Sequence, residues 1–159
     1  MTWTIRMPFD LASKNAVKRN PHARAKRRDS FAGWLIAAAR QQAIPVATRP
    51  PGRGAELVDP VQHRRVTITR IMRPGQRPYD DDGLQAGDAV LLRDAMQPTR
   101  WRYRRGVAVP IGQCLGAGLI NDDSPTWATF AYTQERGVVA GVRVEIQDAP
   151  ELARKVRER

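Results

Sequence analysis

The segment His63–Met72, with the sequence HRRVTITRIM, is rich in β-branched residues, and the fold can be worked out outward from it. A run of this kind predicts a strand, with Val66 and Ile68 on one face. The preceding residues 45–62 are rich in proline and glycine, which predicts an irregular connection. At the start of the chain, residues 2–8 alternate between apolar and polar and predict a first strand.

A helix is predicted between these two strands, over residues 23–43. Four apolar residues recur there at helical spacing and form one stripe. They are Phe31, Trp34, Leu35 and Ala38. Pro45 ends the helix, because proline lacks the backbone N–H that a helix interior needs. Residues 10–21, before the helix, are polar and basic and predict a loop.

Further elements are predicted on the C-terminal side of HRRVTITRIM. Residues 83–96 carry apolar residues at helical spacing, with Asp82 in position to cap the helix. The remaining elements are a hairpin over 101–110 that turns at Arg105-Gly106, strands over 126–134 and 138–146, and a basic helix within 148–159. This order predicts one α+β domain over residues 1–159, with two to three helices on a small mixed β-sheet.

The 159 residues carry a net charge of +11, from 27 basic and 16 acidic side chains. A field of this sign favours a polyanionic partner such as nucleic acid, because each neutralised phosphate releases condensed counterions. A basic surface that only aids solubility is the alternative. One basic run holds seven cations and no acid: Lys14, Lys18, Arg19, Arg24, Lys26, Arg27 and Arg28.

Several other classes of protein are disfavoured. Cys114 is the only cysteine, which excludes an internal disulfide and a zinc site made of cysteines. No stretch approaches the roughly 18 consecutive apolar residues of a membrane span. The first ten residues have no basic-then-apolar signal pattern, so we expect a cytoplasmic protein that does not enter a membrane.

The acidic residues gather into two tight clusters, Asp80-Asp81-Asp82 and Asp122-Asp123. If the chain is extended at the first cluster, Asp80 and Asp82 project to the same face. Crowded carboxylates repel each other unless a cation lies between them, and without histidine or cysteine nearby their oxygens favour Mg²⁺ or Mn²⁺. The alternative is that both clusters are solvated turns.

Three segments together resemble the RusA-type Holliday junction resolvases. A motif of the form Arg-x-Asp-x-Asp-Asn-Leu corresponds to residues 77–84, RPYDDDGL. A later Asp-Ala-Leu corresponds to residues 94–96, and a Gly-hydrophobic-x-x-Asp-Asp segment to residues 118–123, GLINDD. The closing strands correspond to residues 126–146. The resemblance extends from about residue 64 to 146 and is loose in the first third of the chain.

This resemblance implies that Asp80, Asp82 and Asp123 are the catalytic and metal-binding carboxylates, with Mg²⁺ or Mn²⁺ as the cofactor. Members of the family are homodimers that bind four-way DNA junctions and cut two strands symmetrically, and many come from phages or prophages. The expected protein is therefore a hydrolase of DNA recombination and repair, with branched DNA as its partner.

Two positions depart from the family pattern. The asparagine that usually follows the second motif aspartate is Gly83 here. The usual helix lysine, expected near Ala89 or Val90, is absent. Arg93, about one turn further on, could supply the positive charge, although a guanidinium cannot give up a proton. A solvated or ion-paired Arg93 is the alternative.

Residues 97–114 form an insertion that is longer than the link in compact members of the family. Aromatic and cationic residues interleave over 101–105, WRYRR, which suits stacking on unpaired bases and contact with phosphates. In the alternative, the aromatic rings pack on the body and the arginines face solvent. The candidate nucleic-acid-binding residues are Lys14, Lys18, Arg19, Arg24, Lys26, Arg27, Arg77, Arg93, Arg102, Arg104 and Arg105.

Two other hypotheses for the function stay open. Gly83 and the missing lysine are compatible with a non-catalytic protein that binds DNA junctions through a degenerate site. A basic RNA-binding protein, in which the aspartates are turn residues, is the third hypothesis.

Overall fold

Six strands and four helices are formed by the residues that the computed structural model describes, which are 1–13, 20–52, 54–111 and 115–157. The strands are β1 (Thr2–Met7), β2 (Arg64–Met72), β3 (Trp101–Arg104), β4 (Val107–Pro110), β5 (Ala128–Arg136) and β6 (Gly141–Asp148). The helices are α1 (Pro21–Gln41), α2 (Asp81–Gln85), α3 (Asp88–Met96) and α4 (Pro150–Arg157).

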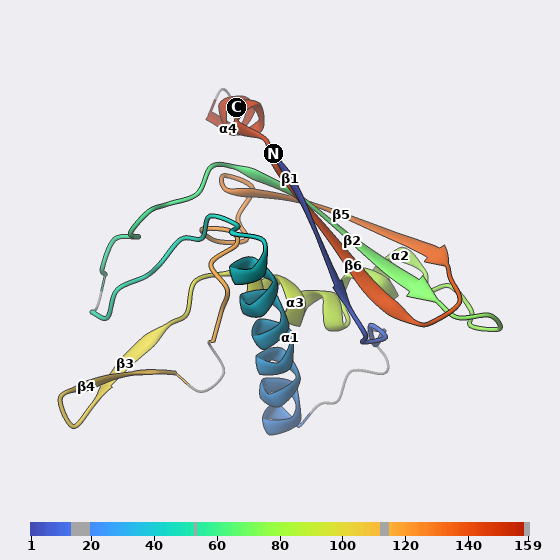
Figure 1. Cartoon of the computed structure of the whole chain (residues 1–159), viewed down its shortest axis with the longest axis horizontal. Coiled ribbons are helices and arrows are strands. Elements are labelled where there is room, and N and C mark those ends of the chain that lie inside the picture. The colour runs from blue at the N-terminus through green and yellow to red at the C-terminus, as the bar shows by residue number, and fades with distance from the viewer. Residues whose placement is uncertain (14–19, 53, 112–114, 158–159) are drawn as a thin grey trace.

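Four strands form a mixed sheet in the order β1-β6-β2-β5. β6 lies between β1 and β2 and is antiparallel to both, whereas β5 is parallel to β2. The long connection from β2 to β5 contains α2, α3 and a separate two-stranded hairpin of β3 and β4. The predicted α+β fold on a small mixed sheet is confirmed (Figure 1).

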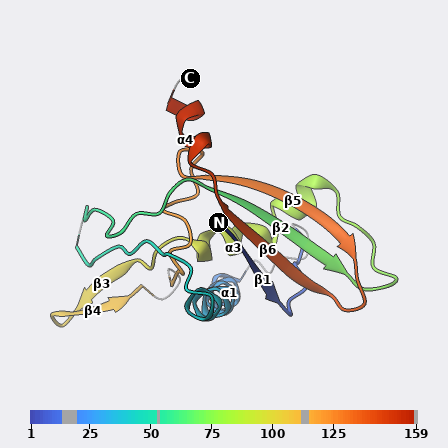
Figure 2. The same ribbon diagram turned by 45° about the horizontal axis from the view of Figure 1, so that its top comes forward.

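Helices α1 and α3 pack against each other on one face of the sheet, which Figures 1 and 2 show from two directions. Val66 and Ile68 of β2 are completely buried on this face, as the alternation of their strand predicts. On the opposite face, Thr129 and Thr133 of β5 are exposed. The sheet therefore has one apolar face under the helices and one polar, open face.

Helix α1 begins at Pro21, two residues before its predicted start. Asn20 caps it, and its side-chain oxygen accepts a hydrogen bond from the His22 amide at 2.9 Å. The predicted apolar stripe is only partly right, since Trp34 is 44% exposed and contacts Phe9 edge-to-face. The residues that α1 buries are Phe31, Ala32, Leu35 and Ala39.

The helix predicted over 83–96 is divided into α2 and α3. Gly87 lies between them with φ −89° and ψ −134°, outside the helical region, so the chain turns before Asp88 begins α3. The prediction that Asp82 caps the helix is wrong, because Asp82 lies in the first turn of α2 and the cap is Asp80. The break at Gly87 therefore separates the short helix that follows Asp80 from α3.

The other predicted elements are present with shifted ends. β5 and β6 begin at Ala128 and Gly141, later than predicted, and α4 lies inside the predicted C-terminal helix. The hairpin turns at Arg105 and Gly106, whose φ angles of 50° and 75° are those of a type I′ turn. Figure 2 shows this hairpin extending away from the sheet. None of the described helices has the length and apolar character to cross a bilayer.

Candidate active site

The half-buried face of β5 is linked to both segments that carry the predicted carboxylates, directly at Tyr79 and through Arg93 at Asp123. This face is formed by every second residue of the strand, Phe130, Tyr132 and Gln134. Gln134 binds the backbone of Tyr79, the residue before Asp80, and Tyr132 binds Arg93, which reaches Asp123. Side chains two residues apart on a strand are about 7 Å apart. Both acidic segments therefore border one short stretch of β5.

Two polar side chains, the half-buried Gln134 and the buried Arg70, contact the residue immediately before Asp80. The Gln134 side chain accepts a hydrogen bond from the Tyr79 amide at 2.9 Å and donates one to the Tyr79 carbonyl at 2.8 Å. Arg70, only 2% exposed, places its guanidinium 3.6 Å from the centre of the Tyr79 ring. Its Nε donates to Asp10 at 3.0 Å. Burial raises the pKa of Tyr79, against the opposing effect of Arg70.

Asp80 has an extended backbone and is the N-cap of α2. Its Oδ1 accepts a hydrogen bond from the Gly83 amide at 2.6 Å. A Cβ atom added to Gly83 would lie 2.7 Å from that oxygen, so an asparagine at this position would push the Asp80 carboxylate aside. The departure from the family pattern at Gly83 thus leaves room for this cap.

Asp82 is exposed and lies in the first turn of α2. The expectation that Asp80 and Asp82 share one face assumes an extended chain, and that assumption is wrong because the helix begins at Asp81. Residues two apart on a helix do not face each other. If the two carboxylates bind one cation, they do so across the first turn of a helix and not along one face of a strand.

Asp123 follows the buried Asn121 and comes before β5. Its neighbour Asp122 shapes the turn, because Oδ1 of Asp122 accepts a hydrogen bond from the Ser124 amide at 2.8 Å. The side chain of Asp123 is 37% exposed, and its Oδ2 lies 3.5 Å from an amino group of Arg93. Asp122 is therefore a turn residue, while Asp123 is directed to a cation.

Arg93 is bound on three sides. Its guanidinium donates to the Tyr132 hydroxyl at 3.1 Å, lies 3.5 Å from Asp123, and is 5.3 Å from the centre of the Phe130 ring. Burial lowers the pKa of Arg93, but the Tyr132 hydrogen bond and the neighbouring carboxylates outweigh it, and the pKa rises above its ordinary value. Arg93 is a permanent cation at the centre of the site.

Asp94 is a carboxylate of this site that sequence reasoning missed. Its pKa is raised, because burial and the nearby Asp123 disfavour its charge, while Arg28, Arg93 and Arg100 only partly offset them. The signal that could have found it is its place in the Asp-Ala-Met segment, one of the three segments that carry the family resemblance.

The carboxylates have the hard oxygen donors that Mg²⁺ and Mn²⁺ prefer. Within the described part of the chain, however, no group of three or more His, Cys, Asp or Glu side chains is arranged to hold a metal ion. Asp80 is engaged with the Gly83 amide and Asp123 with Arg93. Asp80, Asp82 and Asp123 thus fit a divalent cation by chemistry but are not gathered around one point.

Of the two positions at which the lysine was expected, only Ala89 is closed to solvent. Ala89 is completely buried and Val90 is half-buried, so a lysine at Ala89 would point into the core. Arg93, one turn further along α3, is the residue whose cation reaches Asp123, and it is ion-paired as the alternative interpretation expected.

The predicted nucleic-acid-binding residues other than Arg93 fall into three groups. Lys14, Lys18 and Arg19 lie outside the described residues. Those with exposed side chains are Arg24, Lys26, Arg77, Arg102, Arg104 and Arg105. Arg27 is engaged within the fold, since its Nε donates to the buried Asp88 at 2.6 Å and another nitrogen to the Asp10 carbonyl at 2.8 Å.

The hairpin combines the two interpretations of its WRYRR sequence. Trp101 is half-buried at the base, whereas Tyr103 is 63% exposed and the arginines of the turn are also exposed. One aromatic ring thus packs near the body, and the other points outward among cations.

Comparison with protein-family models, curated proteins and solved structures finds no match to this chain.

Proposed function

We propose that this chain is a metal-dependent endonuclease that acts on branched DNA, in particular on four-way junctions. The observation that carries the proposal is the common border of the two acidic segments on β5, with Arg93 between Tyr132 and Asp123. The chain is otherwise strongly basic, at +11. A cationic surface binds phosphates, and carboxylates beside it need a cation before they can approach a phosphate.

In this proposal Asp80, Asp82 and Asp123 would hold Mg²⁺ or Mn²⁺, which requires their carboxylates to move closer together than they lie in this structure. The bound ion would activate water and neutralise charge on the phosphate during hydrolysis. Arg93 binds the same phosphate, which competes with Asp123 for the guanidinium, while the Tyr132 hydroxyl keeps the guanidinium in position. Because Arg93 cannot give up a proton, it acts through charge and hydrogen bonds alone.

The exposed cations extend the contact with DNA beyond the cut. Arg77 precedes Asp80, Arg24 and Lys26 lie near the start of α1, and the remaining cations lie on the hairpin. We further propose a homodimer acting in the cytoplasm of a bacterial or phage-infected cell, because a two-fold assembly matches the symmetry of a four-way junction.

The test is cleavage of a labelled four-way junction, with linear duplex as the control substrate, in Mg²⁺, Mn²⁺ or EDTA. We expect paired nicks on the junction alone, and none in EDTA. Asp82→Asn and Asp123→Asn should each abolish the nicks while junction binding stays equal or becomes tighter, because removing negative charge eases the approach of phosphate.

Asp81→Asn is the matched control, since Asp81 is an exposed acid in the same turn of α2 and has no role in the proposed site. It should retain cleavage. Equal losses in Asp81→Asn and Asp82→Asn would mean that the acidic turn acts only through its overall charge, and the proposed roles would be wrong.

A junction-binding protein without catalysis is the second candidate. It is favoured by the Arg93–Asp123 pair, which engages one proposed ligand, and by the absence of the family's helix lysine at Ala89 and Val90, of which Ala89 is completely buried. Tight junction binding with no nicks in either metal would select this function.

A further inference from the structure

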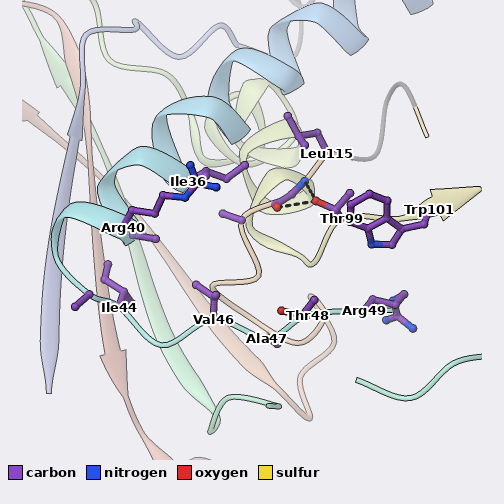
Figure 3. Close-up of a pocket in the computed structure, with 14 residues that line it drawn as sticks. Ile36, Arg40, Ile44, Val46, Ala47, Thr48, Arg49, Thr99, Trp101 and Leu115 are labelled. Carbon is purple, nitrogen blue, oxygen red and sulfur yellow. Dashed lines mark hydrogen bonds between the residues drawn. The ribbon is translucent and has the colours of Figure 1, made fainter. Parts of the chain in front are cut away.

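A pocket of about 560 Å³ lies between the C-terminal part of α1, the segment that follows it and the base of the hairpin (Figure 3). Its walls are mostly apolar, and they include Ile36, Ile44, Val46, Leu115 and the indole of Trp101. None of the proposed catalytic carboxylates lines it. The pocket is therefore a feature separate from the candidate active site.

Among the described residues that line the pocket, the charged ones are Arg40 and Arg49, which Figure 3 shows on opposite sides of it. Neither guanidinium makes an ion pair or side-chain hydrogen bond with another described residue. An apolar floor between two arginines without an ionic partner among the described residues is complementary to an uncharged planar group that has a negatively charged group on either side.

The wall that carries Trp101 is held firmly to the body, although the hairpin beyond it has only two strands. The Thr99 hydroxyl donates to the Gly116 carbonyl at 3.0 Å and accepts from the Gly116 amide at 3.1 Å (Figure 3). A Cβ atom on Gly116 would lie 1.8 Å from the Gln97 carbonyl oxygen, so only glycine permits this contact. The pocket is thus formed before any ligand arrives.

We propose that this pocket binds an unpaired nucleobase, with the flanking phosphates bound by Arg40 and Arg49. The inference rests on the proposed function for its class of substrate, nucleic acid, and adds a site for a single base. Stacking on an aromatic ring beside cations is how proteins bind single-stranded bases without reading their sequence. The volume lies within the roughly 300–1,000 Å³ of small-molecule sites, which is ample for a base and its sugar.

The test measures binding of the full-length protein, in EDTA, to a short single-stranded oligonucleotide that carries 2-aminopurine. The same oligonucleotide with an abasic site at that position is the comparison. We expect the intact strand to bind more tightly than the abasic one. Trp101→Ala should weaken binding of the intact strand roughly 5- to 150-fold and remove this difference, whereas Trp101→Phe should keep most of it.

Tyr103→Ala is the matched control, because Tyr103 is an exposed aromatic residue of the same strand outside the pocket. It should preserve the preference for the intact strand. Ile36→Trp, which fills the pocket but leaves Trp101 in place, should abolish that preference. Thermal unfolding identifies any variant that has lost its fold. If Trp101→Ala does not fold, the result for Ile36→Trp tests the proposal in its place.

Equal affinity of the wild-type protein for the intact and abasic strands would overturn the proposal. So would loss of the preference in Tyr103→Ala and its survival in Trp101→Ala, which would place the base on the outer side of the hairpin. Junction cleavage in Mg²⁺ separates the two proposals. Junction cleavage without a preference for the intact strand would refute only the proposed base-binding pocket. A preference for the intact strand without junction cleavage would refute only the proposed endonuclease activity.

Discussion

Asp80 shows how one side chain can serve both the fold and the proposed chemistry. Its Oδ1 caps α2 through the Gly83 amide, and the cap uses only that oxygen. The cap and the proposed metal ligand can be separated by mutation, because asparagine caps helices as well as aspartate does.

We predict that Asp80→Asn retains the stability of the wild type, whereas Asp80→Ala lowers the free energy of unfolding by about 1 kcal/mol because the cap is removed. Both variants should lose junction cleavage, because neither keeps a carboxylate. Chemical denaturation and the cleavage assay give the two readouts. Full activity in Asp80→Asn would remove Asp80 from the proposed metal site.

The capping residue could not be chosen from sequence, because aspartates at positions 80, 81 and 82 are equally good caps. The choice depends on Gln134, which binds both the amide and the carbonyl of Tyr79 from 55 residues away. In contrast, the acidic character of the site and the position of Arg93 on a helix could be predicted, since both follow from local sequence.

At the scale of elements, the basic run at the start of α1 divides into exposed and buried parts. Arg24 is exposed, whereas Arg27 forms an ion pair with Asp88, whose side chain is 1% exposed. Asp88 also accepts a hydrogen bond from the Ala12 amide at 2.7 Å. Arg27 therefore joins α1, the segment after β1 and the start of α3, and its charge is not available to DNA in this arrangement.

We predict that Arg27→Ala lowers the free energy of unfolding by roughly 2 kcal/mol, because it leaves a buried carboxylate without its cation. The value is below that of a fully buried pair because the Arg27 side chain is 37% exposed. Arg24→Ala, one turn earlier, should leave stability unchanged and weaken DNA binding. Urea denaturation of both variants checks this, and equal stabilities would show that the pair with Asp88 contributes little.

The predicted elements agree with the structure where alternation or spacing is local. β1, β2 and the hairpin turn follow from short patterns of their own residues. The division between α2 and α3 does not, since the chain restarts at Asp88, which is fixed by Arg27 from 61 residues away. The edge-to-face contact of Trp34 with Phe9 has a similar origin, because Phe9 comes from the segment after β1.

At the scale of the whole molecule, part of the positive charge lies on the hairpin of β3 and β4, away from the sheet (Figure 2). Three exposed arginines, Arg102, Arg104 and Arg105, lie on a hairpin that extends from the body (Figure 2). They lie beyond Trp101, which lines the proposed base-binding pocket. Long-range attraction and the base contact would therefore act on the same region of the nucleic acid.

We predict that junction affinity falls steeply with salt, and that replacing Arg102, Arg104 and Arg105 with alanine makes this dependence shallower. The slope of log K against log salt should decrease by roughly 0.9 for each phosphate that the variant no longer binds. Replacing Arg6 and Arg65, on the open face of the sheet, is the control and should leave the slope unchanged. Fluorescence titration over a range of salt gives the slopes, and an unaltered slope in the hairpin variant would refute its contact with DNA.

The strand order has a consequence for how the protein is made. Within the described sheet, β1 is hydrogen-bonded only to β6, the last strand, which also separates β1 from β2. During synthesis, the first strand therefore has no strand to pair with until residues 141–148 have left the ribosome. Until then the hydrogen-bonding edge of β1 stays open, and the four-stranded sheet cannot form in its final order before β6 has been made.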